Sequence, residues 1–230
     1  MTKEGRIAMR RFPSILVAVV AAVAASRSPA AARSIGDVRT IAQLGSCMYV
    51  SHKATALELL NASTAGESDR ALVRLRDEQS CFDRLPTDSH LDTDVAAFSK
   101  GLMRGLVAEA ALRDSRAAAN LQPLPFQQKR YLRPWFAATG RDPAVDEMSA
   151  CIADTDPSGI VALIATASGS SEESWALGNI SPWLGKCLAA GAQLHSDRAA
   201  LRAALADALY QRVRDPQLSL APPPPPEKRS

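Results

Sequence analysis

Two cysteine-bounded segments with matching sequence patterns constrain this chain more than any other feature of its sequence. Residues 47–81 and 151–187 align at an offset of 104, with two residues inserted before the last cysteine of the second segment. Further on, a shorter spacing aligns residues 103–110 with residues 201–208. The sequence therefore predicts one unit with two cysteines, written twice.

Apolar residues recur at steps of three and four through both segments, which is the spacing of one buried helix face. Aromatic residues make up only 5% of the chain, whereas alanine, the best helix former, is abundant. Helices are expected at residues 35–50, 54–60, 68–82, 95–114, 145–153, 157–164, 172–188 and 197–213, with a break at Gly178 and Pro182. The predicted fold class is all-α, with two duplicated helical units of about four helices each, packed as two bundles or merged into one.

The first 32 residues have the pattern of a secretory signal peptide. A basic start precedes the apolar run of residues 14–25, and Ala30 and Ala32 fit a small-residue cleavage site. The run is shorter than the roughly 20 apolar residues of a membrane-spanning helix, although an uncleaved anchor is the alternative. Cleavage would leave 22 basic and 23 acidic residues, a balance that does not favour nucleic acid as a partner. The mature protein is expected in the periplasm of a Gram-negative bacterium or outside the cell, without a membrane span.

The four cysteines are expected to form disulfides, because an exported chain meets an oxidising compartment. Of the three possible connectivities, the repeat favours Cys47–Cys81 and Cys151–Cys187, one bridge in each unit. Buried free thiols are the alternative. A zinc site is less favoured because the chain has no C-x-x-C pair.

These patterns divide the chain into five parts. They are a signal peptide at residues 1–32, unit 1 at 33–118, a connector at 119–142, unit 2 at 143–215 and a proline-rich tail at 216–230. The tail contains five consecutive prolines and is expected to be disordered or to form a polyproline helix.

The connector is the candidate binding segment, because it alone mixes cations with aromatic side chains. Aromatic and arginine residues dominate the strongest contacts of protein interfaces. The candidate binding residues are Lys129, Arg130, Tyr131, Arg133, Trp135 and Phe136. The favoured alternative is a structural strap, in which Trp135 and Phe136 are buried between the two units.

No catalytic residue, metal site or cofactor is predicted. The chain lacks the common hydrolase, P-loop and dinucleotide-binding motifs. The alternating polar residues of segment 88–94 could approach a cation, but helix capping explains their aspartates as well. Glu109 and Asp207 occupy equivalent repeat positions, and we expect them to form surface ion pairs with Arg113 and Arg202.

The sequence therefore favours an exported, non-enzymatic all-α protein that binds a partner or supports the cell envelope. One alternative is a helical module that holds an apolar or anionic small ligand between its two units. A second alternative is a cell-wall hydrolase that uses Glu58 or Glu109 as a helix carboxylate.

Overall fold

The computed structural model describes residues 35–77, 79–83, 99–128, 131–194 and 197–216. Within these ranges the chain forms eight α-helices and two short 3-10 helices, and it has no strand. The elements are α1 (Ile35–Ser51), α2 (Lys53–Asn61), α3 (Ala65–Asp77), η1 (Gln79–Cys81), α4 (Lys100–Ser115), η4 (Pro134–Ala138), α5 (Pro143–Thr155), α6 (Pro157–Ala165), α7 (Ser171–Cys187) and α8 (Arg198–Arg214).

The prediction of an all-α fold with one disulfide in each half is confirmed. Cys47 bonds Cys81 and Cys151 bonds Cys187, and no cysteine of the described residues is free. Each bridge ties a helix of its half to a segment more than 30 residues later. The duplication itself stays a prediction.

Short polar side chains fix where several helices begin. Ser170 accepts a hydrogen bond from the backbone N–H of Glu173, and the Glu173 carboxylate accepts one from the N–H of Gly169. Thr64 and Glu67 form the same kind of capping box at the start of α3. The helix expected to begin at residue 68 therefore begins earlier, because the reciprocal bonds of this box start α3 at Ala65.

The start of α4 also differs from the expectation. Its cap is Ser99, whose hydroxyl accepts a hydrogen bond from the N–H of Leu102, and not one of the polar residues at 92–94. Residues 84–98, including that polar segment, lie outside the described residues.

The expected break in α7 is wrong as well, because this helix runs without interruption through Pro182. A proline in a helix leaves the carbonyl four residues earlier without its donor, and here that residue is Gly178. Gly178 is exposed, and no atom lies within 4 Å of the position that its Cβ would take. Water can therefore solvate the carbonyl, and the helix tolerates the proline.

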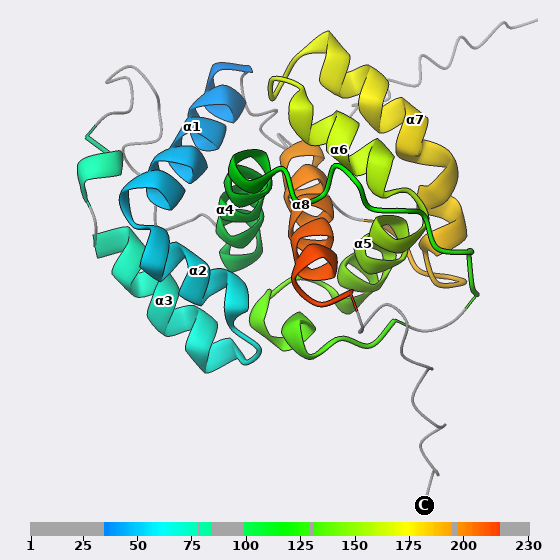
Figure 1. Cartoon of the computed structure of the whole chain (residues 1–230), viewed down its shortest axis with the longest axis horizontal. Helices are drawn as coiled ribbons and strands as arrows, with labels where there is room; N and C mark the ends of the chain where they lie inside the picture. Colours follow the sequence, from blue (N-terminus) through cyan, green and yellow to red (C-terminus); the bar gives the residue numbers. More distant parts are fainter. Residues whose placement is uncertain (1–34, 78, 84–98, 129–130, 195–196, 217–230) are drawn as a thin grey trace, which may run out of the picture. The chain divides into compact units, whose positions relative to one another are not determined.

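Helices α4 and α8 lie side by side at the centre of the described fold (Figure 1). Helices α1 to α3 pack on the α4 side, and α5 to α7 pack on the α8 side. Two apolar cores follow this division, one mainly from α1 to α4 and one mainly from α5 to α8. Most side chains of α4 and α8 are consequently buried.

The two central helices approach so closely that one position admits no side chain. A Cβ added to Gly105 of α4 would fall within 3.0 Å of the backbone and the Cβ of Ala203 in α8. The sequence alignment pairs residues 103–110 with 201–208, so Gly105 and Ala203 hold equivalent places. The helices therefore cross where both repeats carry their smallest residues.

Two reciprocal ion pairs join the same helices. Nε of Arg104 in α4 donates to Asp207 in α8 at 2.8 Å, and Nε of Arg202 in α8 donates to Glu109 in α4 at 2.8 Å. All four residues are buried. The expected pair of Glu109 with Arg113 does form, at 2.8 Å. The expected surface location is wrong for Glu109 and Asp207, because the partner half covers the face that carries them.

The same two arginines also bind the ends of neighbouring helices. Arg104 donates to the carbonyls of Leu59, Leu60 and Ala62 at the end of α2. Arg202 donates to the carbonyls of Ile164 and Thr166 at the end of α6. Helix ends leave carbonyls without intrahelical donors, so each guanidinium satisfies acceptors that burial would otherwise leave unpaired.

Asp207 also pairs with a second guanidinium, that of Arg141, which lies just before α5. Arg141 donates to Asp207 at 2.5 Å and to Asp146 at 2.7 Å, and its third contact is the carbonyl of Gly101. Burial acts to raise the pKa of Asp207, but Arg104 and Arg141 outweigh it and hold this pKa below its ordinary value. Asp207 is thus the charged centre that links α4, α5 and α8.

Among the described residues, no single helix has the length and apolar composition needed to cross a membrane. Helices α5 and α6 together have that length and composition, but they are bent by 102° relative to each other.

Replacing Asp207 with asparagine should lower the free energy of unfolding by about 3–5 kcal/mol, because Arg104 stays buried without its counter-charge and Arg141 keeps only Asp146. Chemical denaturation at pH 7 measures this loss. The wild-type advantage should shrink as the pH falls below about 3.9, since the low folded-state pKa of Asp207 contributes stability only while the carboxylate is ionised. The matched control is Glu58→Gln, which breaks an exposed pair with Arg74 and should cost about 0–1 kcal/mol. Equal losses in both variants would contradict the central role of Asp207.

Gly105→Ala should destabilise the protein by roughly 1–3 kcal/mol, because the new methyl group overlaps the α8 backbone. Gly178→Ala should instead stabilise it by about 0.5–1 kcal/mol, since alanine is the better helix former and its methyl group meets open space. Thermal unfolding of the two single variants tests both signs. A gain in Gly105→Ala would show that α4 and α8 can separate without cost.

Candidate functional site

The connector lies against the protein rather than standing out from it. Trp135 is 2% exposed and Tyr131 is 4% exposed, and both belong to the apolar core formed mainly by α5 to α8. Phe136 is half-buried and meets the Trp135 ring edge-on, with centroids 4.6 Å apart. Lys129 and Arg130 lie outside the described residues. This burial agrees with the strap interpretation, and binding by the connector stays a prediction.

Polar contacts hold the connector to α5 and α8. The Arg133 guanidinium lies 3.6 Å from the carboxylate of Asp154 in α5, and Arg212 of α8 approaches the other oxygen at 3.5 Å. Arg212 also donates to the carbonyl of Gln122. Burial and the charge of Asp154 raise the pKa of the Tyr131 phenol to about 12. These contacts fix the connector to the second half, while its helix η4 also packs against α3 of the first half.

A cleft of about 230 Å³ opens beside the second disulfide. The connector forms one wall, and α5 and the end of α7 form the other. Its lining residues are Phe126, Gln127, Gln128, Tyr131, Glu147, Cys151, Lys186, Cys187, Leu188, Ala189 and Ala190. Phe126 and Trp183 meet at 6.3 Å, and the Lys186 ammonium lies 4.6 Å from the centre of the Trp183 ring. The cleft thus combines aromatic faces with amide and ammonium donors.

The outer face of α7 carries Trp175, the most exposed aromatic side chain of the described residues. Trp175 is 71% exposed, although it belongs to a well-formed helix. At helical spacing it is followed by exposed residues with little or no bulk, and Lys186 completes the row. We call this set the α7 face: Trp175, Gly178, Asn179, Pro182, Gly185 and Lys186. Beyond the tryptophan this face meets open space at its glycines, since nothing lies within 4 Å of a Cβ at Gly178 or Gly185.

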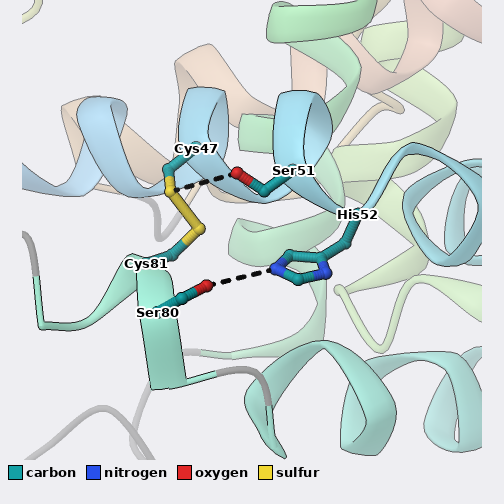
Figure 2. Close-up of a disulfide and its surroundings, with 5 residues drawn as sticks. All are labelled: Cys47, Ser51, His52, Ser80 and Cys81. Atoms are coloured by element: carbon teal, nitrogen blue, oxygen red, sulfur yellow. Dashed lines mark hydrogen bonds between the residues drawn. A yellow bond between two sulfur atoms is a disulfide. The ribbon is translucent and has the colours of Figure 1, made fainter.

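The first disulfide has polar neighbours of its own. Figure 2 shows Cys47 beside Ser51, and the Ser80 hydroxyl pointing toward the His52 ring. The Ser80 Oγ to His52 Nε2 distance is 3.5 Å, which is longer than the 2.6–3.2 Å of a working nucleophile and base. Neither residue lines the cleft beside the second disulfide. We assign this group a structural role at the end of α1.

The candidate carboxylates of the hydrolase hypothesis are both paired. Both oxygens of Glu109 accept from Arg202, and one of them also lies 2.8 Å from Arg113. Glu58 is exposed and pairs with Arg74. Within the described ranges no group of histidine, cysteine, aspartate or glutamate residues could hold a metal ion. The alternating polar segment at 88–94 lies outside those ranges.

Sequence reasoning did not single out the α7 face or the cleft. The signal for the α7 face was present, because the positions three, four and seven residues after Trp175 are Gly178, Asn179 and Pro182. None of these residues can join Trp175 in an apolar stripe, so this tryptophan has no partner on its own helix. The cleft had no such signal, because it needs the connector and the end of α7 to meet in space.

Trp135→Ala should lower the free energy of unfolding by about 3–5 kcal/mol, because it empties a large site in the second core. Trp175→Ala is the matched control, and we expect a change within about 0.5 kcal/mol for this exposed side chain. Denaturant unfolding followed by circular dichroism compares the two. Unchanged stability of Trp135→Ala would reject the strap interpretation of the connector.

The described surface therefore offers two candidate recognition features, the α7 face and the cleft beside the second disulfide. No protein-family model, no curated protein and no solved structure matches this chain.

Proposed function

We propose that this chain is an exported, non-enzymatic helical protein that binds another protein through the α7 face. The observation that supports this proposal is the 71% exposure of Trp175 on a helix whose neighbouring outward positions are small. Tryptophan is among the residues that contribute most to protein interfaces when a partner buries it.

The composition of α7 supports the same proposal. An exposed glycine in a helix costs about 1 kcal/mol relative to alanine, and a proline in the helix interior costs about 3 kcal/mol. Gly178, Gly185 and Pro182 thus weaken α7, and no contact within the described fold requires their small size or their ring. A partner that packs closely against the helix would explain these residues, because small side chains let another surface approach the backbone.

Export is part of the proposal. Residues 1–32 would direct the chain to the periplasm or to the exterior of a bacterium, and they lie outside the described residues. The two disulfides support this location, because such bonds form and persist in oxidising compartments. A protein that acts there through a surface, rather than through chemistry, fits the paired state of Glu58 and Glu109.

The two alternative functions have weaker support. A small ligand held between the two halves would have to displace the direct packing of Gly105 on Ala203 and the reciprocal ion pairs around it. A hydrolase acid needs a carboxyl group with a proton to give, in a cleft that a substrate can enter. Glu109 is buried and fully engaged with guanidinium groups, so it lacks both properties.

Site-specific photo-cross-linking in the native host tests the proposal. A photoreactive amino acid at position 175 should trap one protein in a covalent adduct of reproducible mass, because a partner would bury this position. The same probe at position 50 should trap none, since Val50 is 76% exposed but lies on α1, in the other half. Gly178→Arg should abolish the adduct at 175 by blocking close approach, while circular dichroism confirms that this variant is folded.

Equal adducts at positions 175 and 50 would reject the α7 face as a specific surface. An adduct of this chain with itself would reject a different partner protein and assign the face to self-association. The absence of any adduct at 175 would reject the proposal.

A further inference from the structure

The cleft beside the second disulfide has the chemistry of a groove for a proline-rich segment. Proline residues have no backbone N–H, so a run of prolines offers backbone acceptors but no backbone donors. The cleft supplies donors at the side chains of Gln127, Gln128 and Lys186. It also supplies an aromatic ring at Phe126, and proline-recognition grooves are typically lined by aromatic residues.

The chain itself carries such a segment. Residues 222–226 are five consecutive prolines, and they lie within residues 217–230, outside the described structure. We propose that this proline run of the same chain docks in the cleft of about 230 Å³ between the connector and the end of α7. The inference does not rest on the proposed function, because it concerns an intramolecular contact, although Lys186 belongs to both the cleft and the α7 face.

The tail begins at a hollow that borders the cleft, and it is long enough to extend beyond that hollow. Asp215 lines a small hollow together with Ala150 and Asp154 of α5, whereas Glu147 and Cys151 of the same helix line the cleft. The two hollows therefore lie on adjoining faces of the same turns of α5. An extended chain rises roughly 3.3 Å per residue, so the seven residues from Asp215 to Pro222 can span about 20 Å.

Opposite charges predict the direction in which the docked segment runs. Glu227 follows the last proline, and Lys186 lines the cleft next to Leu188 at the end of α7. A proline run that enters from α8 and lies across Phe126 would bring Glu227 toward Lys186. Tethering also favours this occupant over a free peptide, since a short flexible linker gives an effective concentration of about 1 mM.

The experiment compares the full chain with a variant in which all five prolines of 222–226 are serine. Backbone amide resonances of Ala189 and Ala190, which line the cleft, should shift in the serine variant because the docked rings are lost. A second tail variant, Leu218→Ser with Leu220→Ser, is the matched control and should leave those resonances in place. Free peptide with the sequence of residues 217–230, added to the serine variant, should restore the original positions.

Swapping the charges at positions 186 and 227 provides an independent test. Lys186→Glu should shift the same two resonances toward their positions in the serine variant, and the added change Glu227→Lys should reverse that shift. Thermal unfolding confirms that each variant keeps its fold.

Three results would overturn the proposal. The first is identical cleft resonances in the full chain and the serine variant. The second is a shift in the leucine variant alone, which would make Leu218 and Leu220 the occupant. The third is a shift that disappears on dilution together with a dimer in analytical ultracentrifugation, which would assign the cleft to the tail of a second copy.

Discussion

The reciprocal bonds between α4 and α8 are the interaction on which the rest of the described fold depends. Arg104 reaches from α4 to Asp207, and Arg202 reaches from α8 to Glu109, with all four groups buried. A buried charge is tolerated only when its partners are in place. Each arginine also holds the last carbonyls of α2 or α6, so helix ends on both sides are anchored to this centre.

This centre also explains how the second half differs from the first. Asp207 is approached by Arg141 in addition to Arg104, and Arg141 extends the network to Asp146 in α5. Arg133 and Arg212 then meet at Asp154, one end of the same helix. The connector is therefore bound to the second half by ionic contacts and by Trp135, and the two candidate recognition features, the α7 face and the cleft, both lie on that half.

Much of the fold followed from the sequence, because the repeat and the helical spacing are local signals. They predicted the all-α class and, through the repeat, the correct pairing of cysteines. They failed where a contact joins the halves: residues 103–110 read as one apolar face with charged residues outside, yet Arg104 and Glu109 are buried. A helix packed on all sides by small residues carries no amphipathic pattern that shows which charges lie inside. The cleft was missed for a related reason, since Phe126 and Lys186 are 60 residues apart in the sequence.

The reciprocal contact between α4 and α8 is built from two similar surfaces, one on each half. Each half presents one arginine and one carboxylate to the other, at positions that the repeat makes equivalent, around a crossing of Gly105 on Ala203. A surface with this arrangement is complementary to a rotated copy of itself, which is the property of an isologous, two-fold dimer interface. A protein with only one such unit could satisfy its buried charges by pairing with an identical molecule. Because both surfaces belong to one chain, their pairing does not depend on protein concentration.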